Sequence, residues 1–158
     1  MKFKVKEATL DDYERIKPIH KMVHELHVNG RPDRYKLVEN TLDKDYFRGL
    51  IEGEDGSVFI VEQEKEIIAF AFVRETETPK RATLIPKKNV FIEDFGVDEK
   101  YRGKGLGRML FNKAHDLAKD INADSLELGV WEFNEEAREF YETMGMTTQA
   151  RKMELKIK

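Results

Sequence analysis

A strand–turn–helix–strand unit in the second half of the chain most constrains the fold. The apolar run Val90 to Val97 is followed by the glycine-rich turn Arg102–Gly107 and by the amphipathic run Met109 to Ile121. The next strand pattern is Ser125 to Trp131. Strands joined through a helix pair in parallel within one sheet. This unit therefore predicts a mixed α/β domain.

Hydrophobic periodicity predicts the other elements. Pro18 lacks a backbone N–H, so we expect a kink or break in the first helix there. The alternation of Met153 to Ile157 predicts a final strand. In chain order we expect a strand at 3–5, a helix over 13–26, a short helix over 42–52, hairpin strands at 57–63 and 66–74, a strand at 89–98, a helix over 106–121, a strand at 125–131, a helix over 134–144 and a strand at 153–157.

The composition excludes several classes of protein. The 158 residues suit one domain over 1–158, and a net charge of −3 predicts neither a nucleic-acid partner nor an anionic membrane partner. The absence of cysteine excludes disulfides, a thiol nucleophile and a cysteine-ligated zinc site. The longest apolar run, Ile67 to Val73, is too short to span a membrane. Since the N-terminus shows no signal sequence, we expect a cytoplasmic protein.

The glycine-rich turn is a candidate phosphate site. A turn that opens a helix presents free N–H groups and a positive helix end. A nucleotide P-loop fails, because Asp98 stands five residues before Gly103, where the first glycine is needed. The dinucleotide fingerprint fails as well, since its third glycine falls on Arg108. A purely structural turn is the alternative.

Two motifs resemble those of the GNAT superfamily of acyl-CoA N-acyltransferases. Arg102-x-x-Gly105-x-Gly107, after Asp94-Phe95-Gly96-Val97, resembles its motif A. The second match runs from Leu126 through Trp131, Asn134, Ala137 and Phe140-Tyr141 to Gly145-Met146, so that strong similarity covers about 92–146. The resemblance implies a mostly antiparallel sheet with flanking helices and a splayed pair of parallel strands.

The resemblance also implies that acetyl-CoA is the co-substrate. The pyrophosphate of coenzyme A would lie on the backbone of the turn, and the pantetheine arm would pair with the preceding strand as an added strand does. No metal is expected. The residues implied to contact coenzyme A are Phe95, Gly96, Val97, Arg102, Gly103, Lys104, Gly105, Leu106, Gly107, Arg108, Asn134 and Ala137.

Direct acetyl transfer to a primary amine needs a proton acceptor and a proton donor. Tyr141 matches a tyrosine that hydrogen-bonds the coenzyme sulfur in the family, and its phenol is protonated at neutral pH. Core packing beside Phe140 is the alternative role for Tyr141. Glu93 is the candidate base, in a Glu93-Asp94 pair that resembles the pair of polyamine-type members. Strand alternation directs only one of the two carboxylates into the gap, unless a bulge intervenes.

The acceptor pocket is the least specified part. The resemblance places Arg31, Asp33 and Tyr35 in a loop that lines the acceptor site, and Trp131 and Asp94 are further candidates. The acceptor is a small molecule, such as a polyamine or an amino-sugar, or a protein amine. A homodimer is common in the family. The alternative function is a non-catalytic acyl-CoA-binding regulatory module.

Three histidines of the first predicted helix are candidate metal ligands. His20, His24 and His27 share this helix, but His24-Glu25-Leu26-His27 is one residue short of the zincin pattern His-Glu-x-x-His. Solvated or substrate-contacting histidines are the favoured interpretation.

Overall fold

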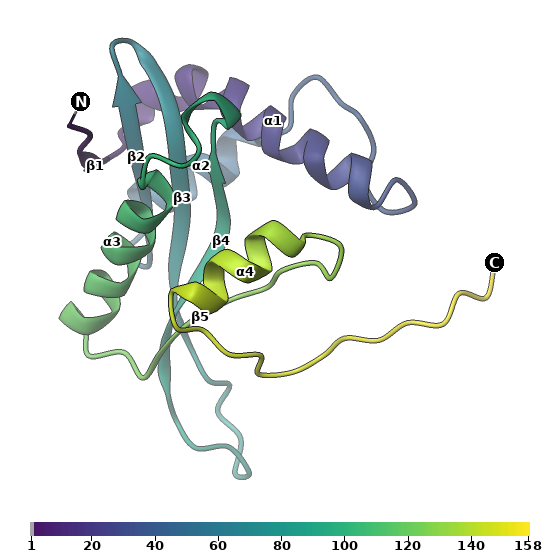
Figure 1. The fold of residues 1–158 in the computed structure, drawn as a ribbon. Helices are drawn as coiled ribbons and strands as arrows, with labels where there is room; N and C mark the ends of the chain where they lie inside the picture. Colours follow the sequence, from purple (N-terminus) through teal and green to yellow (C-terminus); the bar gives the residue numbers. More distant parts are fainter. Residues whose placement is uncertain (1) are drawn as a thin grey trace.

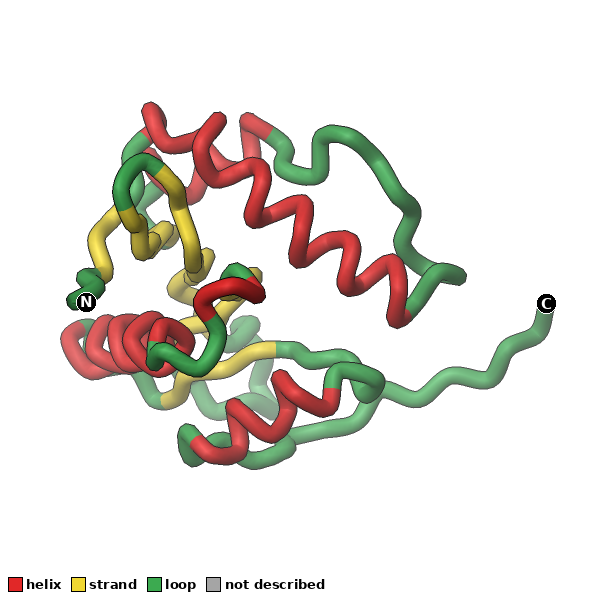
Figure 2. Tube along the Cα trace, turned by 45° about the horizontal axis from the view of Figure 1, so that its top comes forward, coloured by secondary structure: helices red, strands yellow, loops and turns green. Residues whose placement is uncertain are grey.

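The computed structural model describes residues 2–158, which form a five-stranded sheet with helices on both faces (Figures 1 and 2). The strand order is β1-β2-β3-β4-β5, and only β4 and β5 pair in parallel. This arrangement confirms the predicted fold class. The elements are β1 (Val5–Glu7), α1 (Tyr13–Gly30), α2 (Lys44–Glu52), β2 (Gly56–Gln63), β3 (Glu66–Glu77), β4 (Lys88–Val97), α3 (Leu106–Asp120), β5 (Ser125–Leu128) and α4 (Glu135–Thr143), with 3₁₀ turns at Leu10–Asp12 and Glu99–Tyr101.

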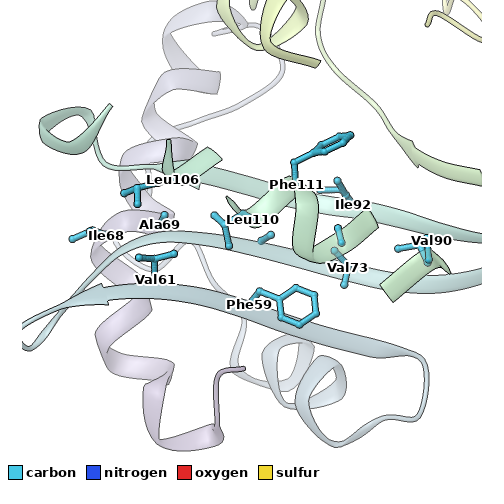
Figure 3. Close-up of a cluster of buried hydrophobic side chains, with 13 residues drawn as sticks. Phe59, Val61, Ile68, Ala69, Val73, Val90, Ile92, Leu106, Leu110 and Phe111 are labelled. Carbon is cyan, nitrogen blue, oxygen red and sulfur yellow. The ribbon is translucent and has the colours of Figure 1, made fainter. Parts of the chain in front are cut away.

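Two hydrophobic clusters fill the two faces of the sheet. Helices α1 and α2 cover one face, where Ile16, Phe47, Phe70 and Phe72 are buried. Helix α3 covers the other face, and its buried residue Leu110 packs against β2, β3 and β4 (Figure 3). The alternation of β2 and β3 supplies both clusters, because successive side chains of a strand point to opposite faces.

A β-bulge in β4 breaks this alternation near the centre of the sheet. Phe72 of β3 pairs with Asp94 and Val73 pairs with Ile92, so the register skips Glu93. Glu93 contacts α2 through Tyr46, and Asp94 contacts α1 through His20. The bulge therefore directs both carboxylates to the face that α1 and α2 cover.

The first helix does not break at Pro18. Helix α1 is continuous from Tyr13 to Gly30, so the predicted break is wrong. Ile16 and Ile19 lie on either side of the proline and are almost wholly buried. Burial of these two side chains outweighs the loss of one helical hydrogen bond.

The predicted strand at 153–157 is absent from the described residues, 2–158. Residues 146–158, which we call the tail, have no regular secondary structure and run away from the body of the molecule (Figure 1). A strand needs a neighbouring strand to bond its N–H and C=O groups, and within this chain the tail pairs with none of the strands. No helix within residues 2–158 has the length and apolar character that crossing a bilayer requires.

Candidate active site

The gap between β4 and β5 holds the candidate site. Their pairing ends at Ile92 and Leu128, after which the two chains separate. A cavity of about 420 Å³ fills the gap and reaches α1 on one side and α4 on the other. This splayed parallel pair is the one that the family resemblance implied.

Most of the predicted site residues meet at this cavity. Its lining includes Glu93, Asp94, Trp131 and Tyr141. All the predicted coenzyme A contacts line it except Lys104, which is exposed outside the lining found for residues 2–158. The motif thus brings together residues from β4, the turn, α3 and α4.

The glycine-rich turn presents the N-terminus of α3 to the cavity. Gly105 is the residue before the helix and has a φ of +84°, a left-handed conformation that favours glycine. Among the described residues no side chain caps this N-terminus. Arg102 and Arg108 add positive charge beside it. Uncapped N–H groups and the helix dipole favour an anion at this position.

The edge of β4 beside the gap is open. From Phe95 to Val97 this strand pairs with β3, whereas its pairing with β5 ended at Ile92. Its backbone groups on the β5 side are thus available to an extended ligand, as at an exposed sheet edge. Helix α1 packs closely against Gly96 on this strand. A Cβ added to Gly96 would lie only 2.3 Å from Cγ2 of Val23 in α1. The close approach of α1 forms one wall of the cavity.

Asn134 caps helix α4, which forms another wall of the cavity. Its side-chain oxygen accepts a 3.2 Å hydrogen bond from the backbone N–H of Ala137 and caps α4. The carboxamide nitrogen of Asn134 is not needed for this cap and stays available to a ligand. Helix α4 in turn carries Tyr141 to the gap.

Tyr141 is a buried phenol next to the gap. Its ring lies 5.9 Å from that of Phe95 and 5.4 Å from that of Phe140. Burial, and then the nearby charge of Asp94, raise the pKa of Tyr141 above its ordinary value. The phenol is therefore protonated across the physiological pH range and can donate a hydrogen bond or a proton.

The two carboxylates of β4 have different partners. Arg74 donates a 2.8 Å hydrogen bond from Nε to Glu93, and Tyr46 lies 3.4 Å from the same oxygen. Burial, and then the charges of Glu93 and Asp94, raise the pKa of Tyr46. The guanidinium of Arg74 balances the negative charge of Glu93.

Asp94 is held by an imidazole and a backbone amide. Its Oδ2 lies 2.9 Å from Nε2 of His20, and its Oδ1 accepts a 3.0 Å hydrogen bond from the N–H of Phe95. Oγ1 of Thr41 lies 2.8 Å from Nδ1 of His20. A neutral imidazole satisfies both contacts when Nε2–H donates to Asp94 and Nδ1 accepts from Thr41. His20 also stacks on Phe72.

Sequence reasoning missed several of these partners. It predicted that His20 is a solvated or substrate-loop residue rather than a partner of Asp94, and it assigned no role in the site to Thr41, Tyr46 or Arg74. The one available signal was a cation, Arg74, placed directly after the apolar run of β3. No group of metal-binding side chains of three or more members occurs within residues 2–158.

Trp131 lines the cavity, three residues beyond the end of β5. Its Nε1–H donates a 2.9 Å hydrogen bond to Oη of Tyr35, and the guanidinium of Arg31 lies 4.7 Å from its ring. Arg31 pairs in turn with Asp33 through two 2.9 Å hydrogen bonds. Arg31, Asp33 and Tyr35 are not part of the cavity lining found for residues 2–158; they support Trp131 from outside.

Comparisons with known proteins agree with this geometry. The model of the acetyltransferase (GNAT) family matches residues 20–146. An uncharacterized N-acetyltransferase of Lactobacillus delbrueckii subsp. lactis is 25% identical over 119 residues, 75% of this chain and 68% of that protein. The L-ornithine N5-acetyltransferase of Arabidopsis thaliana is 30% identical over 95 residues, 60% of this chain and 41% of that protein.

A solved structure extends the likeness to nearly the whole chain. A mutant of the BH1408 protein from Bacillus halodurans superposes with a TM-score of 0.93 and 36% identity, over 98% of this chain and 99% of that one. The family match, the splayed β4–β5 pair and the uncapped N-terminus of α3 all indicate the same family. The chain belongs to the GNAT family of acetyltransferases.

Proposed function

We propose that the protein transfers the acetyl group of acetyl-CoA directly to a primary amine while both substrates are bound. Acetyl-CoA supplies a thioester that is activated toward attack by nitrogen. The observation that carries the proposal is that the buried, protonated phenol of Tyr141 and the carboxylate of Asp94 line the same cavity, in the gap between β4 and β5. Such a pair can supply one proton and remove another at a single site.

The residues of the turn fit the phosphate groups of coenzyme A. Gly105 and the uncapped N-terminus of α3 would hold the pyrophosphate, and the open edge of β4 at 95–97 would hold the pantetheine arm. Asn134 would add its carboxamide N–H to the same arm. These contacts leave the α1 side of the cavity to the amine.

Tyr141 serves as the proton donor to the leaving thiolate. As the new C–N bond forms and the C–S bond breaks, negative charge collects on sulfur. A buried phenol with a raised pKa stays protonated until that charge develops.

Asp94 serves as the proton acceptor, in place of Glu93. A proton taken up by Glu93 would break its 2.8 Å ion pair with Arg74. Asp94 contacts a backbone amide and an imidazole, and its charge reaches Tyr141. It takes the proton that the amine loses, directly or through water, while Glu93 and Arg74 fix the bulged strand.

The acceptor is a small cationic amine with an apolar body. Asp94 supplies negative charge at the reacting end, and Met22, Val23 and Leu26 of α1 supply an apolar wall. A relative named for acetylating ornithine acts on a molecule of this kind. Polyamine-like molecules, amino-sugars and protein amines form the panel to be tested.

Release of free thiol from acetyl-CoA tests the proposal. Because the chain has no cysteine, a thiol reagent reports only coenzyme A. We expect thiol release with at least one small diamine or amino acid, and the acetylated product by mass spectrometry. Stabilisation against heat by coenzyme A without thiol release across the whole panel would instead support the non-catalytic binding module.

A further inference from the structure

His20 is a largely buried titratable residue that the proposed chemistry leaves unused. Its side chain is 11% exposed, and its imidazole stacks on Phe72 of β3 and lies 5.8 Å from the ring of Phe70. It is not part of the cavity lining found for residues 2–158, so it does not meet the substrates directly. Any part that it plays in the reaction must therefore act through a neighbour, and its neighbour in the cavity wall is Asp94.

Asp94 is held at both of its carboxylate oxygens. Nε2 of His20 lies 2.9 Å from Oδ2, and the N–H of Phe95 donates to Oδ1 at 3.0 Å. Two donors on two different oxygens fix the rotation of the carboxylate about its Cβ–Cγ bond. The bond from Phe95 alone would leave that rotation free, and the side chain of Asp94 is 28% exposed, so packing does not replace the contact with His20.

The neighbouring carboxylate is held in a different way. Glu93 pairs at 2.8 Å with Arg74, which is a permanent cation. In its neutral form His20 donates Nε2–H to Asp94 and accepts at Nδ1 from Thr41. It then orients the carboxylate by a hydrogen bond and does not cancel its charge. Asp94 is thus fixed in position and still carries the negative charge that attracts an ammonium group.

We propose that His20, oriented by Thr41, is a positioning residue that holds Asp94 where it can take the proton of the amine. This inference rests on the proposed function, because it takes Asp94 as the proton acceptor. Thr41 bonds one nitrogen of the ring and thereby directs the other nitrogen toward Asp94. A displacement of about 1 Å at a reacting group can cost about 100-fold in rate. Loss of the contact should therefore lower kcat and leave the binding of coenzyme A unchanged.

Two amide substitutions of His20 provide the first test. The side-chain nitrogen of glutamine is as many bonds from Cα as Nε2 of histidine, whereas that of asparagine corresponds to Nδ1. His20→Gln can therefore still donate to Asp94, and His20→Asn can reach only Thr41. We expect His20→Asn to lower kcat for thiol release by up to about 100-fold and His20→Gln to keep most of the activity. Equal kcat values for the two variants would overturn the proposal.

A double-mutant cycle shows whether His20 acts through Asp94. In Asp94→Asn the proton acceptor is already absent, so adding His20→Asn should cause no further fall in kcat. A purely structural role would lower kcat by the same factor in both backgrounds, and such additivity would overturn the inference. The Kd of coenzyme A should equal that of wild type in all variants. His115→Asn, at an exposed position of α3, is the matched control and should keep the wild-type kcat.

The hydroxyl of Thr41 is tested in the same assay. Thr41→Val removes the contact with Nδ1 of His20 and should lower kcat, whereas Thr41→Ser keeps the hydroxyl and should not. Equal kcat values for these two variants would overturn the role of Thr41.

The same measurements separate this inference from the proposed function. Wild-type kcat in Asp94→Asn would contradict the proposed proton acceptor and this inference with it. A low kcat in Asp94→Asn together with wild-type kcat in His20→Asn would overturn the inference alone.

Discussion

Glu93 occupies an extra position in β4, and its insertion turns Asp94 toward α1. In a regular strand the two carboxylates would lie on opposite faces of the sheet. The bulge instead gives one face two acidic side chains with separate partners, Arg74 and His20. Arg74 balances the charge of Glu93, whereas Asp94 meets the amine in the proposed mechanism.

Replacement of each carboxylate by its amide should separate their roles. Asp94→Asn keeps the shape and one of the two hydrogen bonds, from His20 or from the N–H of Phe95, but removes the proton acceptor, so kcat should fall by roughly 100- to 10,000-fold. Glu93→Gln should have a smaller effect on kcat and act mainly on KM for the amine. Steady-state thiol release with saturating acetyl-CoA measures both. Equal kcat for Asp94→Asn and wild type would contradict the assignment of Asp94.

Removal of the phenol should slow the reaction without weakening coenzyme binding. Tyr141→Phe keeps the aromatic contacts with Phe95 and Phe140 and removes the proton donor. We expect kcat to fall by roughly 100-fold or more, with little change in the Kd of coenzyme A. Calorimetric titration and thiol release measure the two quantities. Unchanged turnover would rule out Tyr141 as the donor.

The pH dependence of the wild-type enzyme follows from the raised pKa of Tyr141. A raised pKa means that the phenol keeps its proton at and above its ordinary pKa of about 10. Loss of that proton therefore cannot lower kcat between pH 7 and pH 10. A kcat profile recorded with and without Tyr141→Phe checks this, and an alkaline limb below pH 9 that vanishes in the variant would contradict it.

At the level of the elements, local patterns predicted most boundaries. The strand–turn–helix unit around Gly105 and the end of α4 at Gly145 depend on residues that are close in sequence, and both agree with the structure. Strand β5 stops at Leu128, although its pattern continues to Trp131, because β4 diverges there. That divergence depends on the tertiary structure, so no local sequence pattern predicts it.

We expect Asn134 to link the stability of α4 to the binding of coenzyme A. Asn134→Ala removes the cap of α4 and should lower the free energy of unfolding by about 0.5–2 kcal/mol. It should also raise the Kd of coenzyme A. Asp43→Ala is the matched control, because Asp43 caps α2 through a 2.8 Å bond from the N–H of Tyr46, away from the turn. Denaturant unfolding and titration should show a loss of stability in both variants and weaker binding only in Asn134→Ala.

At the level of the whole molecule, the two halves of the site differ in how far the sequence predicted them. The residues proposed to bind coenzyme A come from one continuous stretch, 92–146, in which each residue has a fixed spacing from the next. The part proposed to receive the amine joins His20 of α1, Thr41 of the following loop, Arg74 of β3 and Asp94 of β4. These residues meet only because α1 and α2 pack on the sheet, so sequence spacing could not bring them together.

The gap between β4 and β5 passes from one face of the sheet to the other, since its walls come from α1 on one face and α4 on the other. In the proposed arrangement coenzyme A binds on the α4 side and the amine on the α1 side, so each substrate has its own route to solvent and neither product needs to wait for the other to leave. Free coenzyme A should then compete with acetyl-CoA alone, and the acetylated amine with the amine alone. Product-inhibition kinetics can measure this, and an acetylated amine that does not compete with the amine would indicate a compulsory order of release.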